Sequence, residues 1–178
     1  MKNILLLLLL FSGVLPAQER YITKKGTINF EASVPSFEEV KAKNSSVTAI
    51  LNTNNGELAA LALIKGFRFK NALMEEHFNE NYIESDDYPK ASFKGKLIDF
   101  DVNNIQNEYT IKGILTLHGQ SKEIETKGVI KKNNDNTISI SSTFITKPSE
   151  FDIKIPRIVS RKIADNISVS LDFILIKK

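Results

Sequence analysis

The chain has 178 residues, a length that suits one domain with a substantial hydrophobic core. Its 24 basic and 21 acidic side chains leave a formal net charge of +3, which is too small to indicate nucleic-acid binding. The absence of cysteine excludes disulfides, thiolate chemistry and a lipid attached at a lipobox cysteine.

The start of the chain has the layout of a secretory signal peptide. Lys2 supplies a basic start, residues 4–11 form a continuous apolar run, and Ala17 offers a small residue for cleavage. The run is too short for a stable membrane span, although an uncleaved anchor helix is the alternative. We therefore expect residues 1–17 to be removed, and residues 18–178 to form one periplasmic or secreted domain without a membrane span. Loss of Lys2 lowers the formal charge to +2.

Period-two alternation and turn signals divide the rest of the chain into strands. Asn54-Asn55-Gly56 predicts a hairpin turn, because Asn and Gly accept positive φ, and His118-Gly119 predicts another turn. Between Phe93 and Phe100 the apolar pattern changes phase, which indicates a β-bulge. The predicted strands are residues 27–34, 47–53, 58–69, 92–102, 109–117, 123–131, 137–146 and 167–176.

About eight antiparallel strands of this length close most easily into a barrel, which removes exposed sheet edges. The fold class is therefore all-β, with one or two short helices at the barrel mouth. Eleven phenylalanines and no tryptophan suit a wide apolar interior. An eight-stranded barrel either fills itself with side chains or holds one small ligand, and the sequence alone leaves both alternatives open.

Residues 66–93 interrupt the strands with a short amphipathic helix. Phe67 and Phe69 share one face of the strand before it. Asn71 is suited to the N-cap, and Glu75 and Glu76 follow where the helix dipole favours acids. The apolar side of the helix consists of Leu73, Met74, Phe78 and Tyr82, with His77 at its margin.

The two histidines, His77 and His118, are the candidates for a catalytic base or a metal ligand. His77 precedes Glu80 by one helical turn but lacks a second histidine nearby, which favours local hydrogen bonding over a metal site. His118 is interpreted in the same way, as a hydrogen-bonding residue of its turn. No hydrolase, zinc-protease or phosphate-binding motif is present, so we expect no catalytic residue, metal or cofactor.

Two charged segments follow, and the second is the more informative. The acidic group Glu84, Asp86 and Asp87 lacks the glycine and terminal glutamate of a calcium loop, which favours a solvated turn. After Pro156 the pattern becomes helical, and Arg157 and Arg161 share one helix face. Two such arginines could hold a phosphate or diphosphate, although solvated side chains on an amphipathic turn are the favoured alternative.

Several segments resemble the YceI-like family of secreted polyisoprenoid-binding proteins. The matching residues are Phe67, Asn71, Leu73-Met74, Glu76-His77-Phe78-Asn79-Glu80, Tyr82, Glu84-Ser85, Tyr88-Pro89, Ala91-Ser92-Phe93, Gly113 to Gly119 with Lys122, and Phe151 to Pro156 with Lys162-Ile163-Ala164. The resemblance implies a lipocalin-like, eight-stranded antiparallel barrel with a helix near its mouth. In the family a glycine often follows the Phe-Asp pair, where this chain has Ile153.

The resemblance also implies non-enzymatic binding, with transport or storage, of a polyisoprenoid, an isoprenoid quinone or a fatty acid-like amphiphile. One alternative is a structural or interaction barrel with a filled core, and another is a lipid-directed hydrolase or isomerase that uses His77 or His118. An exposed edge of the last strand would permit a homodimer. The candidate head-group residues are Arg157 and Arg161, and the candidate pocket residues are Phe67, Phe69, Leu73, Met74, Phe78, Phe93, Leu115, Phe144 and Phe151.

Overall fold

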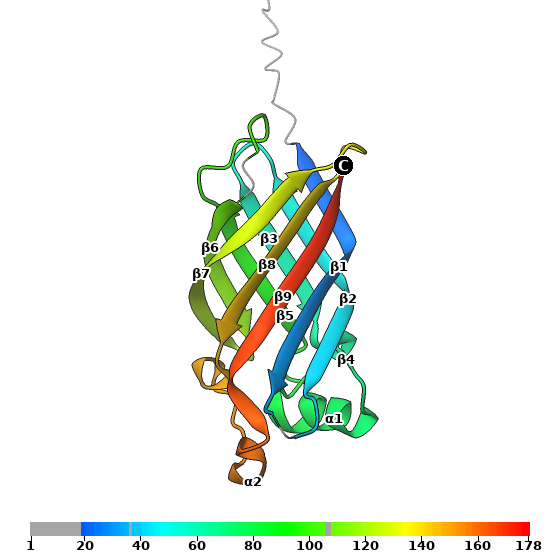
Figure 1. The fold of residues 1–178 in the computed structure, drawn as a ribbon, viewed down its shortest axis with the longest axis vertical. Helices are drawn as coiled ribbons and strands as arrows, with labels where there is room; N and C mark the ends of the chain where they lie inside the picture. The colour runs from blue at the N-terminus through cyan, green and yellow to red at the C-terminus, as the bar shows by residue number, and fades with distance from the viewer. Residues whose placement is uncertain (1–18, 36, 106–107) are drawn as a thin grey trace, which may run out of the picture.

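The computed structural model describes residues 19–35, 37–105 and 108–178 of the chain, and the predicted signal peptide lies outside these residues. They form an antiparallel β-barrel with short helices at one end (Figure 1). The strands are β1 (Arg20–Ser33), β2 (Lys41–Asn52), β3 (Glu57–Leu63), β4 (Arg68–Phe69), β5 (Lys90–Leu97), β6 (Glu108–Leu117), β7 (Gln120–Lys132), β8 (Ile138–Thr146) and β9 (Ile163–Lys177). The helices are α1 (Ala72–His77), α2 (Arg157–Ser160), the 3-10 helices η1 (Ile64–Gly66) and η3 (Pro148–Phe151), and the π-helix η2 (Phe78–Tyr82).

The sheet closes on itself. The strand order is β1-β9-β8-β7-β6-β5-β3-β2, and β1 also pairs with β2, so eight of the described strands form a complete antiparallel ring. The two-residue strand β4 pairs with the start of β2 and lies outside this ring. The predicted eight-stranded antiparallel barrel is confirmed. The exposed edge expected for the last strand is wrong, because β9 pairs with β1 on one side and with β8 on the other.

Two predicted strands end earlier than expected. The strand predicted over residues 58–69 stops at Leu63, and η1 follows it. The fully buried side chain of Asn44 donates to the Leu63 carbonyl at 2.9 Å, and a Cβ on Gly66 would lie 2.6 Å from the same amide nitrogen. The next predicted strand stops at Leu97, and Asp99 then has a φ of 55°. The phase change there therefore marks a strand end and a turn, not a β-bulge.

Both predicted turns are confirmed, and the irregularity of the barrel wall lies elsewhere. Gly56 has a φ of 72° in the β2–β3 hairpin, and His118 and Gly119 have φ values of 49° and 71° between β6 and β7. The pairing of β1 with β2 shifts register on both sides of Gly26, which curves the wall there. A Cβ on Gly26 would lie 2.6 Å from the ring of Phe173, so the absence of a side chain lets this ring pack inward.

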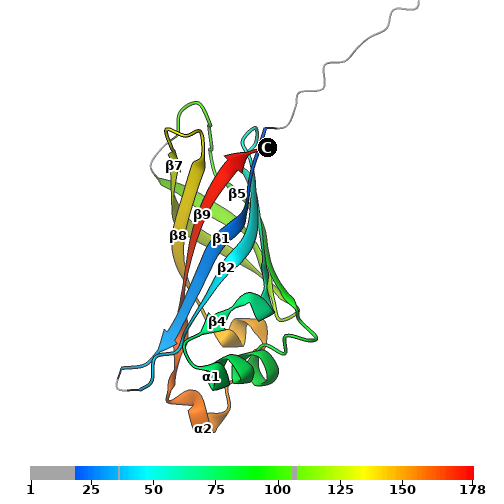
Figure 2. The ribbon, with the colours of Figure 1, turned by 90° about the vertical axis from the view of Figure 1, so that its right-hand side faces the viewer.

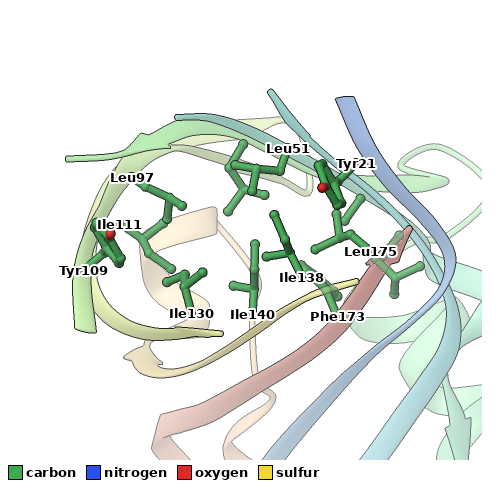
Figure 3. Close-up of a cluster of buried hydrophobic side chains, with 14 of the residues drawn as sticks. Tyr21, Leu51, Leu97, Tyr109, Ile111, Ile130, Ile138, Ile140, Phe173 and Leu175 are labelled. Carbon is green, nitrogen blue, oxygen red and sulfur yellow. The ribbon is translucent and has the colours of Figure 1, made fainter. Parts of the chain in front are cut away.

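The half of the barrel near the C-terminus is filled by a packed core (Figure 3). Inward-facing side chains from β1, β2, β5, β6, β7, β8 and β9 meet in its centre. They include Tyr21, Leu51, Leu97, Tyr109, Ile111, Ile130, Ile138, Ile140, Phe173 and Leu175, each at most 4% exposed. We call this set the closed-end core.

The helices lie at the opposite end of the barrel. Figures 1 and 2 show α1 and α2 together at the end farthest from the C-terminus, where the β1–β2 connection also lies. We call this end the mouth. Within the part of the chain that the structure describes, no helix is long and apolar enough to cross a membrane.

Candidate functional site

A cavity of about 530 Å³ occupies the half of the barrel next to the mouth. Its volume lies within the range of ligand pockets, roughly 300–1,000 Å³. Ile111 and Phe173 line it and also belong to the closed-end core, so they form its floor. Leu51, Ile130 and Leu175 of that core do not line it. The two alternatives for the interior, filled or hollow, are therefore both correct, each for one half of the barrel.

Small residues on two neighbouring strands leave the cavity empty. Ala60 and Ala62 of β3 line it, and Ala91 of β5 faces Ala62 across the strand pair. Ala60 is only half-buried although its neighbours on the inner face, Leu58 and Ala62, are buried. Its remaining exposure therefore faces the cavity.

Phe93 lies against the wall instead of filling the space. Gly95 and Gly113 are opposite each other on β5 and β6. A Cβ on either glycine would come within 2.7 Å of the Phe93 ring, so the ring occupies the space that two side chains would otherwise take. This arrangement keeps an aromatic surface on the wall while the centre of the barrel stays open.

Four phenylalanines hold the helical cover onto the barrel. Phe78 begins η2, Phe67 and Phe69 belong to the segment before α1, and Phe30 comes from β1. The ring centroids of Phe78 lie 5.4 Å from Phe30, 6.2 Å from Phe67 and 5.1 Å from Phe69, distances typical of favourable aromatic pairs. All four rings also line the cavity. The same side chains therefore fix the cover and form part of the cavity wall.

Local hydrogen bonds determine where α1 begins. The Asn71 side chain accepts from the Leu73 amide at 2.9 Å, which confirms the predicted N-cap. The Glu75 carboxylate accepts from the Phe69 amide at 3.1 Å and pairs with Arg68 at 2.7 Å. Because Phe69 belongs to the aromatic group described above, these bonds link the start of the helix to its packed rings.

All nine candidate pocket residues predicted from the sequence line the cavity: Phe67, Phe69, Leu73, Met74, Phe78, Phe93, Leu115, Phe144 and Phe151. Their contact with a ligand stays a prediction. Arg157 and Arg161 do not line the cavity and are exposed on and next to α2. Lys147 and Lys162 line it at the mouth instead, and the sequence offered no pattern that distinguished them from other surface lysines. Phe30 was also missed, although its alternation with Ile28 and Ala32 identified the correct face.

His118 joins two elements of the mouth. Its side chain is buried, with Nδ1 3.0 Å from the Phe151 carbonyl and Nε2 2.9 Å from the Glu84 carboxylate. Its ring centroid lies 4.3 Å from that of Tyr88. The predicted hydrogen bonding within its own turn is therefore wrong, because both partners lie far away in sequence.

The two histidines lie in different surroundings. His118 has both ring nitrogens engaged and does not line the cavity. His77 lines the cavity from α1, where it is exposed. Among the residues that the structure describes, no group of three His, Cys, Asp or Glu side chains could hold a metal ion. Asp86, from the predicted solvated turn, is exposed and pairs with Lys65.

Replacement of His118 by alanine is expected to lower the free energy of unfolding by about 1–3 kcal/mol, because the Phe151 carbonyl and Glu84 lose a buried partner. Chemical denaturation followed by circular dichroism measures this change. His77→Ala is the matched control, since this histidine is exposed on α1. Equal losses in the two variants would contradict the linking role of His118.

The polar groups at the mouth are mostly basic on the side of η3. The Glu150 carboxylate accepts from the Lys147 amide at 2.9 Å and from the Thr146 hydroxyl at 3.0 Å, and these bonds hold the pKa of Glu150 below its usual value. Glu150 is therefore occupied in capping η3. Among the described residues that line the cavity, Lys147 and Lys162 are the two lysines, and no arginine lines it. The site can thus hold an apolar chain inside and meet an acidic group at its entrance.

A model of the YceI-like domain matches residues 21–175 of the chain. A search of curated proteins finds no match. Among solved structures, the chain is similar to a polyisoprenoid binding domain from Saccharophagus degradans that is implicated in plant cell wall breakdown. The TM-score is 0.76 at 12% identity, over 90% of this chain and 99% of that one.

Two further solved structures have the same architecture. Burkholderia cenocepacia BcnA matches with a TM-score of 0.70 at 14% identity, over 85% of this chain and 96% of that one. The Campylobacter jejuni YceI protein matches with a TM-score of 0.65 at 19% identity, over 82% of this chain and 88% of that one. At these identities the likeness shows a common fold.

Proposed function

Because this chain belongs to the YceI-like family, we propose that it binds an apolar lipid of the isoprenoid class inside its barrel. The observation that carries the proposal is the cavity of about 530 Å³, which runs from Phe173 at its floor to exposed residues at the mouth. The similar domain from Saccharophagus degradans is described as polyisoprenoid binding, which supports this ligand class.

The cavity wall favours a ligand without polar groups along its length. It is lined by side chains such as Leu58, Ile111, Leu115, Phe144 and Leu171, and burial of each CH₂ in such a wall gains about 0.8 kcal/mol before ordering costs. Net affinities of drug-sized ligands are nearer 0.3 kcal/mol per non-hydrogen atom. A chain of about thirty carbons would then gain roughly 9 kcal/mol, which corresponds to submicromolar binding without a polar contact.

The proposal is one of binding without catalysis, and carriage or storage of the lipid is its physiological form. The engagement of both His118 ring nitrogens supports it, since a general base needs a free nitrogen toward the substrate. Conversion of a bound isoprenoid that is lost in His77→Ala would overturn this part of the proposal. Product analysis by mass spectrometry after incubation with the lipid measures it.

Export from the cytoplasm belongs to the same proposal. Its support is the basic start and apolar run of residues 1–17, which lie outside the described residues. The mature protein is then expected to begin at Gln18, which intact-mass measurement of the exported protein checks. A full-length protein retained in the cytoplasm would contradict it.

The protein purified from its own cells is expected to carry an isoprenoid lipid. Organic extraction followed by mass spectrometry identifies the lipid and its ratio to protein. The delipidated protein is also expected to bind added polyisoprenoid in a fluorescence competition assay. A protein that is empty after purification and that also ignores added isoprenoids would overturn the lipid-binding proposal.

A further inference from the structure

The tip of α2 exposes an apolar side chain at the far end of the molecule. Ile158 is 87% exposed, more than any other large apolar side chain among the described residues. Figure 1 shows α2 as the part of the fold farthest from the C-terminus. An isoleucine placed there contributes nothing to the closed-end core, and it gains significance only if other exposed apolar side chains lie at the same end.

Two other exposed apolar side chains lie at the same end. Leu73 is 56% exposed on α1, and Phe37 is 47% exposed in the β1–β2 connection. Ser33, the last residue of β1, pairs with Ile163, the first residue of β9, which follows α2 after two turn residues. This pairing brings the β1–β2 connection close to α2. Figure 2 shows all three segments at the mouth end of the barrel. The three exposed apolar groups therefore lie at the mouth end of the barrel (Figure 2), and Leu73 also lines the cavity.

The segment that carries Ile158 is strongly basic. Residues 147–162 contain five basic side chains, namely Lys147, Lys154, Arg157, Arg161 and Lys162. Their two acidic side chains are Glu150, which caps η3, and Asp152, so this segment alone has a net charge of +3, equal to that of the whole chain. Within the described part of the chain, none of the five cations forms an ion pair.

The other elements of the mouth carry acidic side chains, including Glu38 of the β1–β2 connection, which lines the cavity. Glu76 and Glu80 lie on α1 and η2, opposite to α2, and both are exposed. A negatively charged surface would therefore meet the α2 side first. It would contact the α1 side through Leu73 and not through charge.

We propose that the α2 tip docks the mouth of the barrel onto an anionic lipid bilayer. Ile158 would enter the interface between head groups and acyl chains, and the surrounding arginines and lysines would lie beside lipid phosphates. One inserted side chain with a basic cluster gives reversible docking, because stable anchoring requires more buried apolar area. The proposal goes beyond lipid binding in the cavity, since it concerns the surface that delivers the ligand.

Charge complementarity and the position of the cavity favour a bilayer over a protein partner. Lys147 and Lys162 lie both in the basic segment and in the cavity lining, so the surface is continuous with the opening. A docked mouth would let an isoprenoid chain pass from the bilayer into the cavity without crossing water. That route avoids exposure of the chain, at about 0.8 kcal/mol for each CH₂.

The test is flotation of the full-length mature protein with vesicles of phosphatidylcholine and phosphatidylglycerol in equal parts. Binding is expected to the anionic vesicles, to fall with added salt, and to be weak for phosphatidylcholine alone. Each basic residue near an anionic surface strengthens binding by about fivefold, so Lys154→Glu/Arg157→Glu should weaken it more than tenfold. Ile158→Ser should also weaken it several-fold.

Matched controls come from the opposite end of the barrel. Ile174 is 64% exposed on β9, and Lys131 and Lys132 are exposed at the end of β7. Ile174→Ser and Lys131→Glu/Lys132→Glu remove the same chemistry far from the mouth and should leave vesicle binding unchanged. Equal losses of vesicle binding in these controls would overturn the proposal, because they would show that overall charge or overall hydrophobicity drives binding.

Two other results would overturn docking, and one would separate it from lipid binding. Wild-type protein that ignores anionic vesicles overturns it. A second contradicting result is self-association of the wild-type protein in analytical ultracentrifugation that Ile158→Ser abolishes, while the same variant still binds vesicles. The α2 tip would then join two copies of the chain. Ile158→Ser that loses vesicles but still binds polyisoprenoid in solution supports docking. Vesicle binding by a protein that never takes up isoprenoid also supports docking, and only the lipid-binding proposal would fail.

Discussion

Replacement of Ala60 by tryptophan is expected to weaken isoprenoid binding about a hundredfold while the barrel stays folded. Ala60 lines the cavity and its remaining exposure faces the empty space, so the new ring enters the cavity beside Phe93, which lies opposite Ala60 on β5. The indole adds about nine non-hydrogen atoms and excludes a similar number from the ligand. At about 0.3 kcal/mol per atom the loss is about 2.7 kcal/mol, or a factor of about 100 in Kd.

The competition assay with polyisoprenoid measures this change, and circular dichroism confirms that the fold persists. Ala59→Trp is the matched control, because Ala59 is the adjacent residue of β3 and is exposed on the outer face. Unchanged affinity in Ala60→Trp would place the ligand outside the cavity. Equal loss in both variants would indicate that tryptophan in β3 perturbs the barrel itself.

Phe173→Ala is expected to lower the free energy of unfolding by about 3–5 kcal/mol, the usual cost of removing a buried phenylalanine. Phe173 is 2% exposed and packs against Gly26, where a Cβ would come within 2.6 Å of its ring. No side chain on that side can move in to fill the space left by the ring. Such a loss is a large part of the 5–15 kcal/mol that stabilises a typical domain.

Urea denaturation of the delipidated protein gives the free energy without a contribution from ligand. Ile174→Ala serves as the control, since Ile174 is next in sequence but 64% exposed on the outer face. Its replacement should change the free energy of unfolding by less than about 0.5 kcal/mol. A similarly small loss in Phe173→Ala would show that the closed-end core is not what stabilises the barrel.

The barrel could be predicted from the sequence because its evidence is local. The alternation of Ile28, Phe30 and Ala32, and the Asn54-Asn55-Gly56 turn, are visible within a few residues of the chain. The candidate pocket residues followed from the same period and from the family resemblance. Those on strands, such as Phe93 and Leu115, line the cavity because alternation decides which residues of a strand face inward.

The division of the interior could not be predicted, because it depends on contacts across strands. Gly95 and Gly113 give Phe93 its place only because β5 and β6 set them opposite each other. The partners of His118 likewise come from a distant loop and from η3. Spacing alone put Arg157 and Arg161 on one helix face, but it held no information on where that face lies relative to the cavity.

The floor made by Ile111 and Phe173 limits how deep a ligand can go. A lipid tail longer than the cavity must leave its remainder outside. The number of buried carbons therefore has an upper limit that the position of the floor sets. Lipids of different lengths would then differ in the length of chain that protrudes from the mouth, and a long-chain lipid would be only partly enclosed. Smaller side chains at Ile111 or Phe173 would deepen the cavity. They would also remove packing from the closed-end core and so lower the stability of the barrel.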